Sequence, residues 1–479
     1  MRHKQSDQPI VLMKSGNAGG GKGLTNRCPE EVKQLPDAEP GKTLSTKLNR
    51  LSEIAKQNPT FKFTSLAHLM DKECLIRAYM GLNPKATVGI DQVTYKEYGE
   101  KLQENIEDLL QRLKNRKYRA TDIRRKWIPK PDGGQRPLGI LVLEDKIVQK
   151  AVAMILNAIY EQDFQETSYG FRNKRSAHDA LRALELMIIR KNANYILDVD
   201  IKGYFDNIDH QWLMEMLRQR IVDRTILRLI GKWLKVGVLD EGKRISNDTG
   251  VPQGSVISPL LANIYLHYVL DLWIRKIARR LTGRIDLVRY CDDFVIGCTN
   301  RKDAEIVWKM LQERVQKFGL EVSQEKSRVI EFGKKAYMRS KREGEKLATL
   351  DFLGFTHFMT SGRNGGLKLG RKTIGKRMRR RLVALKQDLK RRRNVVPFKE
   401  LYKHLCRILK GYYNYFGFAG NSLTLNKFSY AVRRIWFKCL NRRSQRKSFN
   451  WTEFRELLKR YPLPEPRIRK TYKWIHSAS

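Results

Sequence analysis

The chain has few acidic residues for its length. Its 479 residues include 50 Asp and Glu against 95 Lys and Arg, which gives a formal net charge of +45. A compact protein with this charge repels itself unless a polyanion neutralises it. Nucleic acid is therefore the expected partner, and a chain of this length has room for two or three domains.

Cysteine and long apolar runs are also scarce. None of the six cysteines forms a Cys-x-x-Cys pair or lies at zinc-ligand spacing from a histidine. This pattern argues against a disulfide framework and a structural zinc site, and it fits a reducing cytoplasmic compartment such as the bacterial cytosol. No apolar run approaches the roughly 18 residues that a membrane helix needs, and no secretory signal is recognisable.

The positive charge is concentrated near the C-terminus. Residues 371–479 contain 31 Lys and Arg against 5 Asp and Glu, a net of +26. Aromatic residues are interleaved with the basic ones, a combination that suits RNA backbones and unstacked bases, although most of these aromatics are expected to be core. The best candidates for RNA contact are two arginine runs: Arg379, Arg380, Arg381, Arg391, Arg392 and Arg393.

Periodicity and turn residues predict a mixed chain. Residues 1–45 contain Gly, Lys and Pro with little periodicity, which predicts a disordered tail. Strands are expected at 127–138 (a hairpin), 196–201, 286–298 (a second hairpin) and 350–358. Helices are expected within 46–118, at 143–164, from an N-cap at Asp209 to Arg220, at 258–281, at 301–318, and throughout the region after 371.

Two aspartates stand side by side in the second hairpin. Asp292 and Asp293 lie between two β-rich runs, and like charges at a tight turn cost folding energy that a bound cation offsets. Metal-assisted phosphoryl transfer needs carboxylates from two rigid elements that converge on two cations. The strand that ends at Asp200 is the second element, and the backbone carbonyl of Ile201 is a further candidate ligand. Asp198 shares a strand face with Asp200 and remains an alternative.

Two other features suit a nucleotide. Lys130 and Arg136 flank the turn of the first hairpin, where two cations can clamp a triphosphate. Taken alone, they are more simply read as two exposed hairpin charges. Residues 250–259 form a loop that opens a long helix, where Gln253 can hydrogen-bond a sugar or a base and the glycines permit close approach to a base pair. Alone, this is only a helix-start loop.

The order of these features resembles the group II intron-encoded reverse transcriptases and maturases. The resemblance extends over about residues 46 to 475. The motifs that carry it are at 127–138, 168–172 (Ser-Tyr-Gly-Phe-Arg), 198–210, 249–266, 290–293 (Tyr-Cys-Asp-Asp), 319–327, 351–355 (Asp-Phe-Leu-Gly-Phe) and 411–416 (Gly-Tyr-Tyr-Asn-Tyr-Phe). Cys291 stands where this family commonly has Ala, and Cys is small enough to keep the metal geometry.

The resemblance implies a right-hand polymerase of mixed α/β (α+β) class. Its parts would be a helical extension over 46–118, fingers and palm with an antiparallel palm sheet over 119–360, an α-helical thumb (domain X) over 371–435, and a short basic region over 436–479 that is a possible DNA-binding remnant.

The resemblance also implies RNA-directed DNA synthesis. Asp200, Asp292 and Asp293 would hold two Mg²⁺ ions, which Mn²⁺ can replace. The partners would be the intron RNA as template, a DNA primer or target, and deoxynucleoside triphosphates. Binding of the intron RNA would assist splicing and retrohoming. The oligomeric state stays open.

The incoming nucleotide would contact Lys130, Arg136 and Gln253, and Phe205 would be the wall that a ribose 2′-hydroxyl strikes. Without the resemblance, Phe205 is a core phenylalanine after a strand. Three other functions remain. An RNA-dependent RNA polymerase typically has Gly where this chain has Cys291. A splicing-only RNA-binding maturase would be free to lose the carboxylates. A domesticated or defence-associated reverse transcriptase is disfavoured by the long domain X-like segment.

Overall fold

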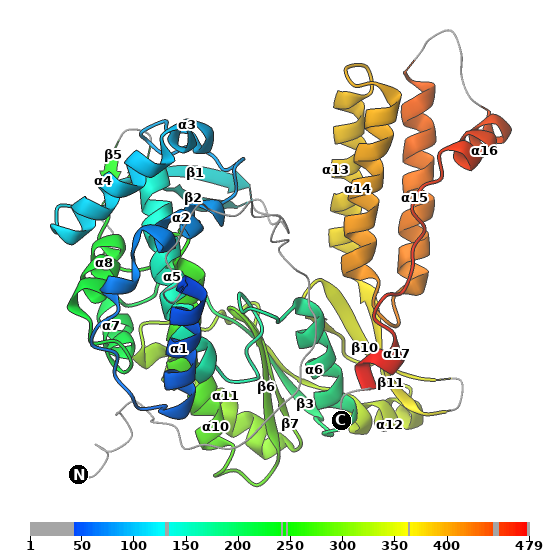
Figure 1. Ribbon diagram of the computed structural model, residues 1–479. Helices are drawn as coiled ribbons and strands as arrows, with labels where there is room; N and C mark the ends of the chain where they lie inside the picture. The colour runs from blue at the N-terminus through cyan, green and yellow to red at the C-terminus, as the bar shows by residue number, and fades with distance from the viewer. Residues whose placement is uncertain are drawn as a thin grey trace.

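The structure is a computed structural model, and it describes residues 43–129, 134–240, 243–245, 248–362, 365–443 and 450–476. Most of the predicted N-terminal tail and Lys130 lie outside these residues. Figure 1 shows a mostly helical lobe built from the N-terminal half, a central sheet, and an upright bundle of helices at the C-terminal end.

The first lobe is built around α5 (Leu143–Asp163), which is apolar on nearly all sides and therefore buried. Helices α1 and α2 pack directly against it. A small sheet of order β2-β1-β4-β5 lies at the edge of this lobe. The elements of the lobe are α1 (Leu44–Gln57), η1 (Ala67–Leu69), α2 (Lys72–Met80), α3 (Tyr95–Glu100), α4 (Leu102–Lys114), β1 (Ile123–Pro129), β2 (Gln135–Ile140), α7 (His210–Arg218), α8 (Arg224–Leu234), β4 (Val238–Asp240) and β5 (Lys243–Ile245).

The central sheet has the order β6-β7-β3-β8, and each neighbouring pair is antiparallel. Its strands are β3 (Tyr195–Asp200), β6 (Ile285–Tyr290), β7 (Asp293–Cys298) and β8 (Arg328–Glu331). Alternate residues of β7 enter two different hydrophobic cores: Phe294 packs with the first lobe, and Val295 packs with the C-terminal region. Because both faces are covered, this strand is continuously apolar after Asp293. An antiparallel palm sheet was expected, and the structure confirms it.

Further helices complete the middle of the molecule. They are α6 (Ala177–Ile189), η2 (Tyr204–Asp206), α9 (Ser258–Leu266), η3 (His267–Asp271), α10 (Leu272–Ile277), α11 (Arg301–Lys317) and α12 (Gly333–Glu343). Asp209 caps α7 as predicted, accepting a hydrogen bond from the N–H of Trp212 at 2.8 Å, but the helix ends at Arg218 rather than Arg220.

Two predicted elements are corrected. The helix expected at 258–281 is interrupted, because η3 is a π-helical turn between α9 and α10. The strand expected at 350–358 is a hairpin of β9 (Leu350–Phe352) and β10 (Phe355–Ser361). Its turn residues Leu353 and Gly354 have φ of 48° and 85°, a left-handed pair that reverses the chain. Strand β11 (Leu367–Thr373) pairs with β10 and continues past residue 371, where only helix was expected.

The C-terminal region is helical. Its elements are α13 (Gly375–Arg392), α14 (Phe398–Phe416), α15 (Ser422–Asn441), α16 (Trp451–Arg460) and α17 (Tyr472–His476). Tyr412, Phe418 and Trp436 are buried, so these aromatics form the core as predicted. A buried ion pair of 2.5 Å between Arg371 and Glu185 joins β11 to α6. The fold class is therefore confirmed as mixed α/β with antiparallel sheets and a helical C-terminal region. Among the described residues, no helix is both long and apolar enough to cross a membrane.

Candidate active site

The Asp-Asp hairpin has a two-residue loop. Tyr290 of β6 pairs with Asp293 of β7, so Cys291 and Asp292 form the connection. Cys291 has φ of 60°, the left-handed region that two-residue hairpins require at their first loop position and that usually selects glycine. Its side chain is buried, whereas Asp292 and Asp293 reach the surface. The turn thus places both carboxylates at the outer end of the hairpin.

Asp200 meets this hairpin at the end of β3. It is the register partner of Asp293 on the neighbouring strand. Its backbone is held on the other side: the N–H of Asp200 donates to the hydroxyl of Ser327 at 3.0 Å, and its carbonyl accepts from the N–H of Ser323 at 2.8 Å. The two predicted carboxylate-bearing elements are therefore adjacent and rigid.

The adjacent carboxylates perturb one another. Asp293 is accessible at its tip but surrounded by protein on most sides, and this desolvation raises its pKa to about 7, with Asp292, Asp198 and Asp200 adding repulsion. Burial likewise raises the pKa of Asp198 to about 6, although Arg328 lies 3.5 Å from its carboxylate. The cluster therefore carries more negative charge than its surroundings stabilise.

Lys326 places one positive charge beside the carboxylate cluster. Its ammonium lies 3.6 Å from the Asp200 carboxylate, and both side chains are largely exposed. Within the part of the chain that the structure describes, no three carboxylate, His or Cys side chains lie close enough to hold a metal ion as they stand.

The donor atoms nevertheless fit a hard cation. Carboxylate and carbonyl oxygens are the ligands of Mg²⁺ and Mn²⁺, and a cation would relieve the crowding that raises the pKa of Asp293. Ile201 pairs with Val322 in an isolated antiparallel β-bridge. Its two hydrogen bonds run from the N–H of Ser323 to the carbonyl of Asp200 and from the N–H of Lys202 to the carbonyl of Glu321. The carbonyl of Ile201 is left out of both bonds.

A buried hydrogen-bond network that the sequence analysis did not predict supports the hairpin. Arg289 and Asp271 are both fully buried, and the guanidinium donates to the carboxylate at 2.7 and 2.5 Å. Arg289 also donates to the side-chain oxygen of Asn263 at 3.0 Å and to the backbone carbonyl of Cys291 at 3.1 Å. The only signal was a charged residue inside an apolar strand.

Neighbouring elements complete this support. Asn263 donates to the carbonyl of Gly170 at 2.7 Å. A Cβ atom at Gly170 would lie 2.5 Å from the backbone nitrogen of Cys291, so the Ser-Tyr-Gly-Phe-Arg motif packs directly on the hairpin tip. Asp271 lies in the π-helical turn η3, and such turns frequently occur at functional sites because they redirect a side chain.

The predicted nucleotide residues lie on elements that meet beside this cluster. The carbonyl of Phe205 accepts from the N–H of Val251 at 2.7 Å, which joins η2 to the 249–254 loop. Gln253 donates from its side chain to Asp206 at 3.2 Å, so Asp206 holds this glutamine. A hollow of about 260 Å³ is lined by Asp206 and Gln253, among other residues.

The first hairpin reaches the same place. The N–H of Gly139 on β2 donates to the carbonyl of Gln253 at 2.6 Å. A Cβ at Gly254 would lie 2.5 Å from the carbonyl oxygen of Gly139, so this glycine permits contact with the protein's own chain. Arg136 is exposed near the outer end of β2, and its proposed companion Lys130 is outside the described residues.

Six basic residues of the C-terminal bundle line a groove. A cavity of about 370 Å³ lies between α13 and α15, with Tyr430, 65% exposed, among its lining residues. Its cations come from both helices: Lys386, Lys390, Arg393, Arg434, Lys438 and Arg442. This "thumb groove" joins residues about fifty positions apart in sequence.

The arginine runs contribute little to the thumb groove. Arg393 is their one member among its lining residues. Arg392 is held by Asp388 at 2.8 Å, and Asp388 also contacts His404 at 2.6 Å. The other four are exposed on α13: Arg379, Arg380, Arg381 and Arg391.

Comparison with known families finds two matches. The model of the reverse transcriptase (RNA-dependent DNA polymerase) family matches residues 128–357. The model of the group II intron maturase-specific domain matches residues 375–458. The first match includes Asp200 and the Asp-Asp hairpin, and the second includes the thumb groove.

Individual relatives agree with these matches. The group II intron-encoded protein LtrA of Lactococcus lactis subsp. cremoris is 38% identical over 234 residues, which cover 47% of this chain and 38% of that protein. The protein YkfC of Escherichia coli K12 is 36% identical over 248 residues, 50% of this chain and 64% of that protein. An uncharacterized 91 kDa protein in a cob intron of Schizosaccharomyces pombe is 36% identical over 242 residues, 49% of this chain and 29% of that protein. The matched region thus spans less than two thirds of each of these relatives.

Proposed function

Because the chain combines a reverse transcriptase domain with a group II intron maturase-specific domain, we propose that it is an RNA-directed DNA polymerase that also binds intron RNA to assist splicing and retrohoming. The observation that carries the polymerase assignment is the register of Asp200 opposite Asp293, beside the two-residue loop that presents Asp292. The substrates are an RNA template, a DNA primer and deoxynucleoside triphosphates.

Asp200, Asp292 and Asp293 are the proposed ligands of two Mg²⁺ ions, with the carbonyl of Ile201 as a further donor. When bound, such ions lower the pKa of the attacking 3′-hydroxyl and stabilise the charge of the leaving pyrophosphate. The chain's own part is to hold the carboxylates on two rigid strands and to exchange the contact between Lys326 and Asp200 for the ions. Mn²⁺ has the same oxygen preference and should substitute.

The residues beside the cluster select and position the nucleotide. Phe205 is the proposed wall against the ribose 2′-hydroxyl. Gln253, whose side chain donates to Asp206, is the proposed hydrogen-bond partner of the incoming nucleotide. Arg136 and Lys130 are the proposed triphosphate contacts, where an arginine fork can bind two phosphate oxygens.

The C-terminal bundle is the proposed grip on RNA. The thumb groove presents basic residues of two helices with an exposed tyrosine, a combination that binds phosphates and stacks on bases. The six arginines of the two runs remain candidates for further phosphate contacts, with Arg392 the least available because of its ion pair with Asp388.

The polymerase assignment is tested by Asp292→Asn. This change removes one carboxylate charge from the metal site and leaves the basic surfaces unchanged, so primer extension on an RNA template should be lost while intron RNA binding persists. The matched control is Asp286→Asn on the same hairpin, where the carboxylate contacts Lys191 at 2.7 Å and Arg284 at 2.9 Å. Full primer extension by Asp292→Asn at millimolar Mg²⁺ would refute the assignment.

A further inference from the structure

Two sequence motifs without a role in the site described so far meet at one turn. The Asp-Phe-Leu-Gly-Phe motif at 351–355 contains the turn between β9 and β10, and the Gly-Tyr-Tyr-Asn-Tyr-Phe motif at 411–416 ends α14. The hydroxyl of Tyr415 donates to the backbone carbonyl of Leu353 at 2.8 Å. Figure 1 shows α14 ending beside β10, so this bond connects the C-terminal bundle to the β9–β10 turn.

The β9–β10 turn has a conformation that its sequence does not favour. Leu353 has φ of 48°, the left-handed region that costs a leucine free energy. Such a residue keeps this conformation only where the surrounding structure imposes it. The N–H of Ile374 donates to the carbonyl of Gly354 at 3.2 Å, and a Cβ atom at Gly354 would clash with the guanidinium of Arg377 in α13. The contacts that impose the turn therefore come from the beginning of α13 and the end of α14.

Tyr415 is itself held in place by α6 and β10. Its backbone carbonyl accepts from Nε2 of His178 at 2.7 Å, and its ring stacks on Phe355 with the ring centroids 6.1 Å apart. Burial raises the pKa of the Tyr415 phenol to about 12, so the hydroxyl keeps its proton at neutral pH and can donate to Leu353. Because its backbone and its ring are both fixed, Tyr415 gives the turn a fixed point of attachment.

The turn reaches the carboxylate cluster on its other side. Burial and the neighbouring Asp292 raise the pKa of Asp293, and a hydrogen bond from the backbone N–H of Leu353 to the Asp293 carboxylate opposes this rise. The N–H of Leu353 thus faces Asp293, whereas its carbonyl faces Tyr415. If the bond to the carbonyl is lost, the strained turn can relax, and the donor beside Asp293 moves with it.

We propose that Tyr415 is a positioning residue for the polymerase reaction: its hydroxyl holds the β9–β10 turn so that the N–H of Leu353 keeps the Asp293 carboxylate in place within the cluster. The C-terminal bundle then helps to set the geometry of the metal site through a residue that does not contact the substrate. The inference rests on the proposed function, in which Asp293 is a metal ligand.

The first test is Tyr415→Phe, which removes the hydroxyl and keeps the ring. Affinity for Mn²⁺ is measured without nucleic acid, from the electron paramagnetic resonance signal of the free ion, and Asp292→Asn shows how much binding belongs to other sites. Extension of a primer on a short RNA template is measured against Mg²⁺ concentration. The dissociation constant for Mn²⁺ and the Mg²⁺ concentration for half-maximal extension should both rise about 2- to 10-fold, the effect of one hydrogen bond. The KM for the primer–template should not change.

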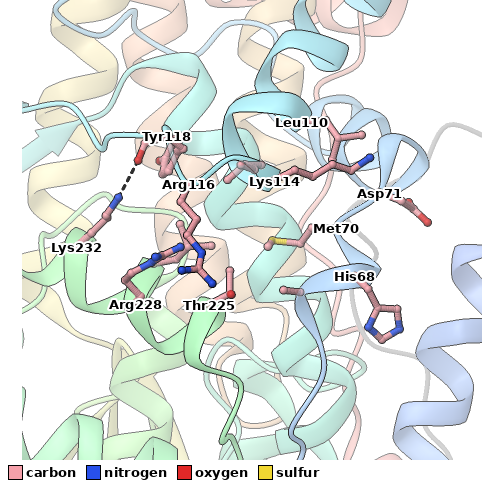
Figure 2. Close-up of a pocket in the computed structure, with 13 residues that line it drawn as sticks. His68, Met70, Asp71, Leu110, Lys114, Arg116, Tyr118, Thr225, Arg228 and Lys232 are labelled. Atoms are coloured by element: carbon pink, nitrogen blue, oxygen red, sulfur yellow. Dashed lines mark hydrogen bonds between the residues drawn. The ribbon is translucent and has the colours of Figure 1, made fainter.

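Two other hydroxyl deletions are matched controls. Tyr402, also on α14, donates to the carbonyl of Pro462 at 2.7 Å. Tyr118 lines a hollow of about 500 Å³ in the first lobe (Figure 2), where its hydroxyl donates to the Asp145 carboxylate and accepts from Trp233 at 3.1 Å. Tyr402→Phe removes a similar bond from the same helix, and Tyr118→Phe removes buried bonds from another lobe. Both variants should keep the wild-type affinity for Mn²⁺.

A second test asks whether Tyr415 acts through the turn. Leu353→Gly removes the cost of the left-handed conformation, so the turn needs less support from the hydroxyl. Tyr415→Phe should therefore weaken Mn²⁺ binding less in the Leu353→Gly background than in the wild type. Equal changes in the two backgrounds would mean that the two residues act independently, and they would overturn the proposed mechanism.

The measurements distinguish failure of this inference from failure of the proposed function. A wild-type protein that neither binds Mn²⁺ at the cluster nor extends primers would overturn the polymerase assignment. If the wild type extends primers and a folded Tyr415→Phe variant has unchanged Mn²⁺ affinity and Mg²⁺ requirement, only the role of Tyr415 is overturned. Equal losses in Tyr415→Phe and both control variants would also overturn it, because they would reflect general destabilisation. Circular dichroism establishes that each variant is folded.

Discussion

Replacing Arg289 with Met should damage both stability and polymerase activity, and the two effects can be separated. Arg289 and Asp271 are fully buried, and removal of the guanidinium leaves the Asp271 carboxylate without its partner. Breaking a buried ion pair in this way typically costs about 3–5 kcal/mol. The free energy of unfolding of Arg289→Met should fall by about this amount.

A second variant removes the uncompensated charge. In Arg289→Met combined with Asp271→Leu, apolar side chains replace both ions, a change that is often close to neutral for stability. Most of the lost stability should therefore return. Activity should not return, because the carbonyl of Cys291 has lost its donor at 3.1 Å and the hairpin is free to shift. A displacement of about 1 Å at an active site can cost about 100-fold in rate.

The control is another buried pair in the same chain. Arg220 and Asp163 are 3% and 5% exposed with a separation of 2.9 Å, and Arg220 donates to the carbonyls of Asn58 and Phe61 rather than to the hairpin. Arg220→Met with Asp163→Leu should leave primer extension per folded molecule unchanged. Denaturation followed by tryptophan fluorescence gives stability, and extension is measured against Mg²⁺ concentration. Full activity of the Arg289→Met and Asp271→Leu variant would show that the network only stabilises the fold.

Further predictions concern the nucleotide wall, two glycines and the thumb groove. Phe205→Val should lower discrimination against ribonucleotides, by roughly 1–3 kcal/mol if the phenyl ring is the wall, and an unchanged ratio of efficiencies in an active variant would make Phe205 a core residue only. Gly170→Ala should abolish extension while RNA binding persists, because the new Cβ would lie 2.5 Å from the Cys291 nitrogen. Gly411→Ala, whose Cβ would have no atom within 4 Å, should instead raise the free energy of unfolding by about 0.5–1 kcal/mol, measured by thermal unfolding. Replacing the six thumb-groove cations with glutamine should lower the slope of log K for RNA binding against log salt concentration by about 2–3 if half of them touch phosphate. If the slope falls only when residues 379–381 are neutralised, the phosphate contacts lie on the exposed face of α13 instead.

Local patterns predicted many elements of the palm correctly. The hairpin at 286–298, the strand before Asp200 and the cap at Asp209 each depend on residues close in sequence, and the structure has all three. The errors were also local in origin. The pattern of residues 350–358 predicts one strand and misses the turn at Leu353 and Gly354, because leucine rarely adopts the left-handed conformation that Leu353 has here.

The sequence by itself determined the resemblance to the group II intron-encoded reverse transcriptases and maturases and the positions of the paired carboxylates, because each is written in short runs of neighbouring residues. Only the tertiary structure decided how Arg289 reaches Asp271 and which basic residues near α13 and α15 share the thumb groove. These contacts join residues far apart in sequence. Their energies come from burial and from the distance between charges, which the packing of whole elements sets.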